Sequence, residues 1–216
     1  AVSTDGSNLH TVVNTAFLQA MDAAVWIFAF APNSHKLLFT LKQAGLSFTP
    51  FYDLYVVDVS SSVSVVTLVF PSGQGGIPTF SPDGQWMSVY HLGGLDLARV
   101  DGSSSHNIVT YPEGYEPATF GPTITWLPDS TAFVLYHIPD PVADLYNGGL
   151  WYIPVDGEPE KRISVSSTWG IPSPDGQRVG YSTPGTPSEI HIVEADGTDI
   201  IYKSFPAATF TGWAPD

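Results

Sequence analysis

The sequence predicts an all-β fold made of four-stranded antiparallel blades, the architecture of a β-propeller. Three observations support this prediction. A turn motif that starts with proline recurs about every 40 to 50 residues, which is the length of one propeller blade. A second turn motif, built on aspartate, alternates with the first. Short runs rich in β-branched and aromatic residues lie between the turns, so each repeat is expected to hold four strands.

The first motif is a proline followed by Asp or Asn and then by Gly or Ser. Proline presets φ for the second position of a type I turn, and glycine adopts the positive φ that closes a short hairpin with a bulge. The motif therefore predicts a strand on each side. At Ser34 and Ser130 serine replaces glycine, where positive φ would cost about 1 kcal/mol, so another turn geometry is expected there. The motif begins at Pro32, Pro82, Pro128 and Pro174, and the chain ends inside a fifth copy, Pro215-Asp216.

The second motif is an aspartate, usually after valine and often before glycine. It falls between successive copies of the first motif, so the two kinds of turn alternate along the chain. In a four-stranded antiparallel meander, turns that alternate in this way lie at the same end of every blade. Because these acids recur with turn chemistry, we interpret them as structural rather than as a catalytic or metal-binding cluster. They are Asp5, Asp58, Asp101, Asp156 and Asp196.

The strands between the turns give four complete blades and partial strands at both ends of a single domain, residues 1–216. Residues 1–13 are expected to form the end strand of a preceding blade, and residues 208–216 the first strand of a following blade. A ring cannot close in this way, and open edges invite aggregation, so we expect the chain to be a fragment of a longer propeller. The blades are predicted at residues 25–70, 77–111, 123–166 and 168–206.

The repeats resemble those of the TolB-like β-propeller family, which carry an aromatic residue and a small residue ahead of Pro-Asp-Gly. The resemblance covers nearly the whole chain, although Pro172 replaces the aromatic residue in one repeat. It implies a bacterial, extracytoplasmic protein, because this propeller type occurs in periplasmic scaffold proteins and cell-envelope lipoproteins. It also occurs as the gating domain of dipeptidyl-peptidase and prolyl-oligopeptidase relatives. The matching aromatic residues are Phe30, Phe80, Trp126 and Trp213.

Composition and motifs exclude several classes of protein. The formal net charge of −14 would repel nucleic acid and anionic membrane surfaces. No apolar run approaches the roughly 18 residues of a membrane helix. The sequence has no cysteine, no Gly-x-Ser-x-Gly, no His-Glu-x-x-His and no complete calcium-binding loop. We therefore predict a chain without catalytic residues, metal or cofactor.

The long connections at the other end of the blades are the predicted binding face. Irregular loops on a rigid scaffold commonly bind partners, and aromatic side chains with polar tips suit a protein or glycan. His91 and His137 both end second strands of neighbouring blades and are expected to face the same opening. The alternative is that the rings pack against their own loops. The predicted binding residues are Phe51, Tyr52, His91, Tyr111, Tyr115, His137, Asp140, Asp144 and Tyr146.

Three functions fit this pattern. The first is a non-catalytic, extracytoplasmic TolB-like propeller that binds a protein or glycan through the long-loop face. The second is the propeller of a serine peptidase related to dipeptidyl peptidases and prolyl oligopeptidases, whose hydrolase domain would carry Gly-x-Ser-x-Gly outside this chain. The third is a structural subunit whose open ends are completed by a neighbouring subunit through strand addition.

Overall fold

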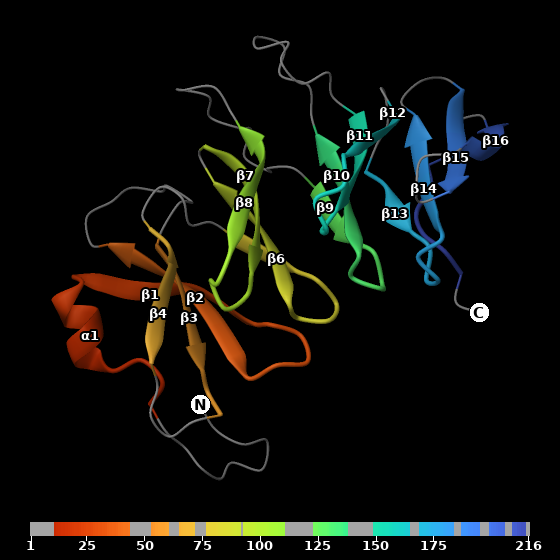
Figure 1. Ribbon diagram of the computed structural model, residues 1–216. Coiled ribbons are helices and arrows are strands. Elements are labelled where there is room, and N and C mark those ends of the chain that lie inside the picture. Colours follow the sequence, from red (N-terminus) through yellow and green to blue (C-terminus); the bar gives the residue numbers. More distant parts are fainter. Residues whose placement is uncertain are drawn as a thin grey trace. The chain divides into compact units, whose positions relative to one another are not determined.

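The strands form four separate four-stranded antiparallel sheets, and the chain divides into two compact units after residue 116 (Figure 1). In each sheet, strands that follow one another in sequence lie side by side. The computed structural model describes residues 11–43, 53–60, 65–71, 77–91, 93–110, 123–137, 149–164, 169–183, 187–194, 199–205 and 209–214.

The N-terminal unit holds the first two sheets. Their outer strands, β4 and β8, each pair with one neighbour. The first sheet consists of β1 (Ala23–Phe30), β2 (Lys36–Gln43), β3 (Asp53–Asp58) and β4 (Val66–Phe70). The second consists of β5 (Ile77–Phe80), β6 (Trp86–His91), β7 (Gly94–Arg99) and β8 (Ser105–Thr110).

The C-terminal unit holds the other two sheets, which have the same meander order. The third sheet consists of β9 (Thr123–Trp126), β10 (Ala132–His137), β11 (Gly149–Pro154) and β12 (Lys161–Ser164). The fourth consists of β13 (Ile171–Pro172), β14 (Arg178–Thr183), β15 (Ser188–Glu194) and β16 (Asp199–Phe205). The four sheets thus span residues 23–70, 77–110, 123–164 and 171–205.

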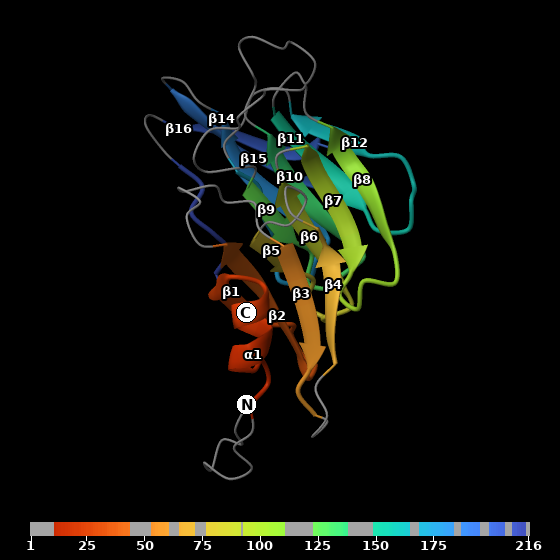
Figure 2. The same ribbon diagram turned by 90° about the vertical axis from the view of Figure 1, so that its left-hand side faces the viewer.

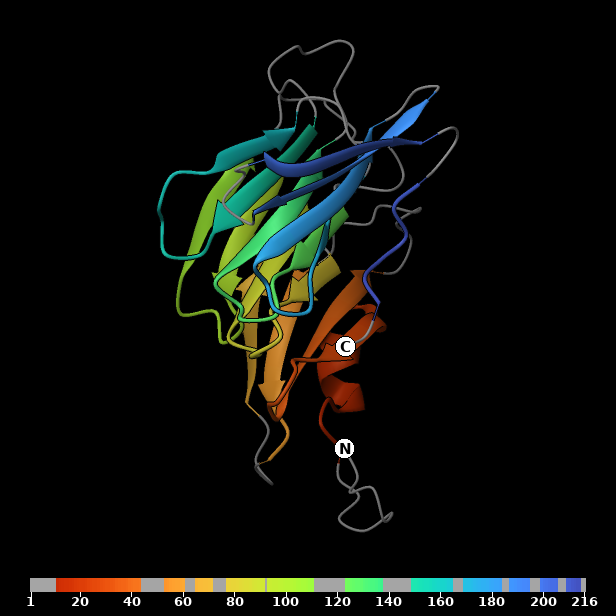
Figure 3. The same ribbon diagram turned by 90° about the vertical axis from the view of Figure 1, so that its right-hand side faces the viewer.

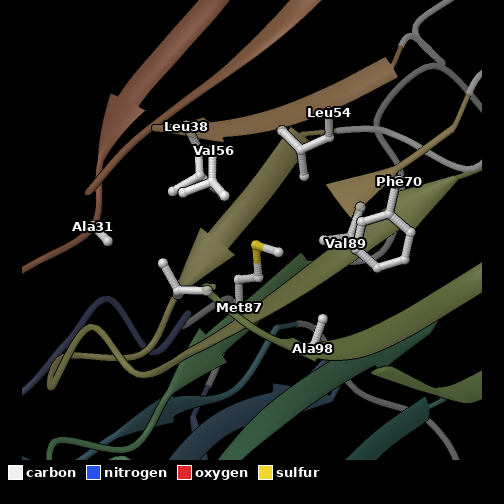
Figure 4. Close-up of a cluster of buried hydrophobic side chains, with 9 residues drawn as sticks. Ala31, Leu38, Leu54, Val56, Phe70, Met87, Val89 and Ala98 are labelled. Atoms are coloured by element: carbon white, nitrogen blue, oxygen red, sulfur yellow. The ribbon is translucent and has the colours of Figure 1, made fainter. Parts of the chain in front are cut away.

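The two sheets of the N-terminal unit pack face to face through apolar side chains (Figure 4). Alternate residues of a strand point to opposite faces, so Leu38, Leu54 and Val56 meet the second sheet while their neighbours point away from it. This packing explains why strands such as β3 are apolar on both faces. The buried cluster comprises Ala31, Leu38, Leu54, Val56, Phe70, Met87, Val89, Ala98 and Val100.

A short helix, α1 (Thr15–Ala20), covers the opposite face of the first sheet, which we call its outer face (Figure 2). Asn14 caps the helix, because its side-chain oxygen accepts a hydrogen bond from the Phe17 backbone N–H at 2.8 Å. The Phe17 ring meets Tyr55 edge-on at 5.9 Å, and Phe39 stacks on the same tyrosine at 5.5 Å. The buried residues of this face are Phe39, Leu41, Tyr55 and Val57.

Only residues 11–13 of the end strand predicted at 1–13 are described. Residues 11–13 form no strand, and the helix follows where the sequence indicated a loop between blades; residues 1–10 lie outside the described residues. The helix was missed because it is only 6 residues long, without charged residues in its terminal turns. A helix of this length depends on tertiary packing, here of Phe17 against Tyr55.

The sheets of the C-terminal unit also pack face to face. Gly170 passes so close to the third sheet that a Cβ atom there would lie 2.7 Å from Leu150 Cδ2, so only glycine fits without a shift. The buried residues of this interface are Leu127, Ala132, Val134, Leu150, Val179, Tyr181 and Val193.

Residues 209–214 lie against the fourth sheet without forming a regular strand, which corrects the prediction of a first strand at 208–216 (Figure 3). Phe210 N–H donates to Ser182 Oγ at 2.6 Å, and Trp213 Nε1 donates to the Ile171 carbonyl at 2.9 Å. The Phe210 ring fills the space that a side chain at Gly180 would need. The segment is therefore anchored by one backbone N–H and by its two rings. No strand within the described ranges pairs with its backbone, as a regular strand would require.

The proline turns of the second and fourth sheets share one hydrogen-bond network. Ser81 Oγ donates to Asp83 Oδ1 at 2.6 Å and accepts from Trp86 N–H at 2.9 Å, which closes the hairpin. Ser173 and Asp175 repeat the arrangement in the fourth sheet, with a hydroxyl-to-carboxylate distance of 2.5 Å. The hydrogen bonds from Ser173 and from the backbone lower the pKa of Asp175. The carboxylates of these turns hold the hairpins, as the sequence indicated.

Two turns carry serine in place of glycine, and they differ. Gly84 and Gly176 have φ of 69° and 72°, and Ser130 adopts nearly the same value, 64°. The expectation of another geometry is therefore wrong at Ser130, whose N–H keeps the turn hydrogen bond to Leu127 at 3.0 Å. In the first sheet the positive φ moves one residue earlier, to Asn33 at 52°, so the expectation is confirmed at Ser34.

In the first three sheets the aspartate turns lie at the same end as the proline turns. Val100 N–H donates to the Gln85 carbonyl at 3.1 Å, and Val155 N–H donates to the Thr131 carbonyl at 3.0 Å, so the two kinds of turn touch. The aspartates accept hydrogen bonds from the backbone N–H two residues later, which makes them structural. These pairs are Asp58 with Ser60, Asp101 with Ser103, and Asp156 with Glu158.

We predict that Gly84→Ala destabilises the N-terminal unit much more than Gly102→Ala. Both glycines have positive φ, 69° and 75°, which costs any other residue about 1 to 2 kcal/mol. At Gly84, however, a Cβ would lie 1.8 Å from the Pro32 carbonyl oxygen, whereas at Gly102 the nearest atom, Val69 Cγ2, is 3.4 Å away. Urea denaturation should show at least about 2 kcal/mol of extra loss for Gly84→Ala. Equal losses of unfolding free energy in the two variants would contradict the close contact between the Gly84 turn and the Pro32 turn.

Candidate functional site

Most of the predicted binding face lies outside the described residues. This holds for Phe51, Tyr52, Tyr111, Tyr115, Asp140, Asp144 and Tyr146. His137 ends β10, where its backbone pairs with Gly149. It belongs to a different unit from His91, so the expected proximity of the two histidines stays a prediction.

His91 is the predicted residue that can be examined in full. It ends β6, and only two residues separate it from β7, so the connection at 91–94 is a tight hairpin rather than the long irregular loop that was expected. His91 pairs with Gly94, and Val89 pairs with Asp96. Because residues two apart on a strand share a face, His91 and Asp96 are diagonal neighbours on one face. Recognising a two-residue hairpin loop between His91 and Gly94 would have revealed this pair from the sequence.

Both ring nitrogens of His91 face groups of its own hairpin. The residue is 6% exposed. Nδ1 accepts a hydrogen bond from Gly93 N–H at 3.0 Å, so the proton of the neutral ring lies on Nε2. Nε2 is 3.3 Å from Asp96 Oδ1, in an electrostatic contact that lacks hydrogen-bond alignment. This arrangement leaves the ring poorly placed to bind a metal or to take a proton from a substrate.

Asp96 links His91 to the edge strand of the same sheet. Asn107 Nδ2 donates to Asp96 Oδ1 at 2.8 Å, and Thr110 Oγ1 donates to Asn107 Oδ1 at 2.7 Å. Burial is the largest single influence on Asp96 and raises its pKa. The contact with His91, the hydrogen bond from Asn107 and electrostatic attraction by the His91 and His106 rings together outweigh burial, so the net pKa of Asp96 is lowered. The network therefore joins β6, β7 and β8 around a stable carboxylate.

Two further polar contacts are local to single sheets. In the first sheet, Tyr55 Oη donates to Asp53 Oδ2 at 3.0 Å, and burial, this bond and the Asp53 charge raise the pKa of Tyr55 to about 12. In the fourth sheet, the His191 ring stacks on Tyr181 with centroids 4.9 Å apart, and its Nε2 is 3.5 Å from Glu189 Oε2. Sequence reasoning missed both contacts, although the residue spacing within each strand places Asp53 with Tyr55 and Glu189 with His191.

Within the described part of the chain, no group of three or more His, Cys, Asp or Glu residues could hold a metal ion. None of the helices in that part of the chain has the length and apolar character needed to cross a membrane. The polar contacts around His91, Tyr55 and His191 each stabilise the sheet that carries them.

Neither a protein-family model nor a curated protein matches the sequence. Two similar solved structures are dipeptidyl peptidase 4 of Porphyromonas gingivalis and prolyl oligopeptidase B of Galerina marginata. The first has a TM-score of 0.54 and 16% identity over 79% of this chain. The second has a TM-score of 0.50 and 14% identity over 87% of this chain. In both, the similarity is to the propeller domain.

The fold is a β-propeller. The chain spans 31% and 32% of the length of the two structures, so the similarity covers about a third of each. These neighbours support the propeller of four-stranded blades, but they do not support TolB membership in particular.

We predict that His91→Ala destabilises the N-terminal unit, whereas His106→Ala does not. Removing the buried ring leaves Asp96 with fewer partners, which should cost about 1 to 3 kcal/mol. His106 is exposed on β8, and its loss should change the free energy of unfolding by less than about 0.5 kcal/mol. Urea denaturation at neutral pH measures both. Similar losses for the two variants would refute the structural role of His91.

We predict that Asp96→Asn makes the free energy of unfolding depend less on pH in the acidic range. Because the folded-state pKa of Asp96 is below the ordinary 3.8, its carboxylate stabilises the fold above that value. This contribution is lost as the pH falls through the lower, folded-state pKa. Asparagine cannot titrate, so the gap in unfolding free energy between wild type and variant should shrink toward low pH. Asn107→Leu, which removes the donor but keeps the carboxylate, should shrink the wild-type pH dependence in part. A gap that is constant with pH would contradict the lowered pKa.

Proposed function

We propose that this chain is part of the propeller domain of a serine peptidase of the dipeptidyl-peptidase or prolyl-oligopeptidase type. The observation that carries the proposal is the similarity in fold to the propeller of dipeptidyl peptidase 4 over 79% of the chain. The neighbours favour this function over the TolB-like binding protein. On this proposal the chemistry belongs to a hydrolase domain outside these residues, and the propeller limits which peptides reach it.

The described side chains fit a scaffold better than a catalyst. His91 directs both ring nitrogens at its own hairpin. The carboxylates of the aspartate turns also interact with their own hairpins. Hydrogen bonds from Ser60 and Ser103 lower the pKa values of Asp58 and Asp101. The sequence has no Gly-x-Ser-x-Gly, so a nucleophilic serine of the hydrolase type must come from elsewhere.

A second candidate function rests on the proline turns. In most repeats an aromatic residue lies two positions before the proline. This is the TolB-like pattern, and it supports a bacterial, extracytoplasmic scaffold that binds a protein or glycan through the long-loop face. A third candidate is a structural subunit whose open ends are completed by a neighbouring subunit through strand addition.

The test of the peptidase proposal uses the complete reading frame that encodes this chain. We expect it to carry Gly-x-Ser-x-Gly after the propeller, followed by Asp and His. The complete polypeptide should react with a fluorophosphonate probe and cleave a fluorogenic peptide at proline, because both require an activated serine. Replacing that serine by alanine should abolish both signals.

The 216-residue chain alone is the matched control and should not react with the probe. A complete polypeptide without the motif, or one that is folded and unreactive, would overturn the peptidase proposal. The TolB-like candidate would then be tested by alanine substitutions at Tyr52, Tyr115 and Tyr146, which should weaken partner binding if the long-loop face is the binding surface.

A further inference from the structure

The chain carries six Asp-Gly pairs, a sequence in which the backbone can modify itself. The glycine nitrogen attacks the aspartate side chain and closes a five-membered succinimide ring. Glycine hinders this attack less than any other residue, because it has no Cβ atom and its backbone is the most adaptable. The structure describes four of the pairs, which begin at Asp83, Asp101, Asp156 and Asp175.

Closing and reopening the ring need no reagent other than water. Because resonance delocalises the amide lone pair, the glycine nitrogen attacks Cγ of the neutral carboxyl group after losing its proton. The carboxyl hydroxyl then leaves as water. A second water molecule cleaves the bond between the ring nitrogen and the α-carbonyl carbon. The product is isoaspartate, whose main chain runs through the side-chain carbonyl and whose α-carboxylate is free.

The attacking nitrogens of the four described pairs differ in their hydrogen bonds. The N–H groups of Gly84, Gly102 and Gly176 each donate to a backbone carbonyl of their own turn at 2.9 Å. This bond retains the proton that must leave and holds the nitrogen in place, so it opposes ring closure. Gly157 N–H donates no hydrogen bond to any residue in the described part of the chain. Its nitrogen is therefore the least restrained of the four.

The carboxylates of the four pairs differ in the same sense. All four accept a hydrogen bond from the backbone N–H two residues later. Asp83 and Asp175 also accept from serine hydroxyls at 2.6 Å and 2.5 Å, and Asp101 lies 3.7 Å from Lys36 Nζ. Among the described residues, Asp156 has only the backbone bond, at 3.1 Å. Its carboxyl group is therefore the easiest to turn toward the glycine nitrogen.

Space and protonation favour the same pair. Gly84 and Gly176 are buried, whereas Gly157 is exposed and a Cβ atom there would meet nothing within 4 Å. The turn at Gly157 therefore has room to change shape as the ring closes. Ring closure also requires a neutral carboxyl group. Hydrogen bonds from nearby serines lower the pKa values of Asp101 and Asp175, which reduces the neutral fraction of these two carboxyl groups at any given pH.

We propose that Asp156-Gly157 is the preferred site of isoaspartate formation in the folded chain, ahead of the other three described Asp-Gly pairs. The pair lies between β11 and β12. Val155 N–H remains bonded to the Thr131 carbonyl at 3.0 Å, so the added backbone carbon falls on the β12 side of this anchor. The exposed α-carboxylate is the group that isoaspartyl methyltransferases methylate from S-adenosylmethionine, so the modified turn is a substrate for that class of enzyme. The inference does not depend on the proposed peptidase function.

The test is incubation of the 216-residue chain at neutral pH, once folded and once in guanidinium chloride. Electron-transfer mass spectrometry of its peptides then gives the rate of isoaspartate formation at each pair. In the folded chain, Asp156 should react at least about fivefold faster than Asp83, Asp101 or Asp175, because each of those must first break a turn hydrogen bond. In guanidinium chloride the turns are lost and all four carboxyl groups precede glycine, so the four rates should converge.

Two variants identify the site. Asp156→Glu keeps the charge but would have to close a larger ring, so it should remove the main folded-state product. Asp101→Glu makes the same change in another exposed aspartate turn and should leave that product intact, which makes it the matched control. Labelled methyl transfer by an isoaspartyl methyltransferase should therefore fall more in Asp156→Glu than in Asp101→Glu, with circular dichroism confirming that both are folded.

The comparison of folded and unfolded wild type decides the proposal even without the variants. Equal rates at the four pairs in the folded chain overturn it, because the turn hydrogen bonds would then have no influence. A folded-state rate that is highest at Asp83, Asp101 or Asp175 also overturns it. So does a preference for Asp156 that persists in guanidinium chloride, since that preference would come from local sequence and not from the fold.

Discussion

The contact between successive proline turns determines how the sheets of each unit meet. In the N-terminal unit, Asn33 Nδ2 donates to the Pro82 carbonyl at 3.0 Å, and Gly84 lies directly against the Pro32 carbonyl. In the C-terminal unit, Gly176 approaches Pro128 Cδ, which a Cβ atom would contact at 3.5 Å. The second proline turn of each unit therefore both reverses its own chain and rests on the first turn of that unit. With one end of two sheets fixed in this way, their apolar faces are brought together along the strands.

Much of this fold could be predicted because the signals are local. Proline and glycine restrict φ within a few residues, and antiparallel neighbours joined by short turns need no long-range information. Helix α1 could not be found in this way, because its stability comes from Phe17 packing on a tyrosine 38 positions away in the sequence. The turn at Ser130 shows a related limit. The surrounding hairpin holds a serine at φ 64° although its intrinsic preference opposes it.

The candidate site was less accessible to sequence reasoning. The predicted loops are rich in aromatic residues, but composition alone does not determine whether a ring faces a partner or its own chain. His91 illustrates the difficulty. Its identity suggested a functional residue. Its position at the end of β6, however, places its ring nitrogens in contact with Gly93 and Asp96 of its own hairpin. Only the register of the hairpin, a tertiary property, separates these interpretations.

Helix α1 determines whether the outer face of the first sheet is shielded from solvent. A helix of 6 residues is far below the roughly 12 residues at which isolated helices persist in water, so it exists only while it is docked. Conversely, the apolar face formed by Phe39, Leu41, Tyr55 and Val57 is shielded only while the helix is present. Docking and helix formation are thus one cooperative event. Another sheet can stack on the outer face of the first sheet only after helix α1 leaves it, so release of the helix sets the barrier to such stacking.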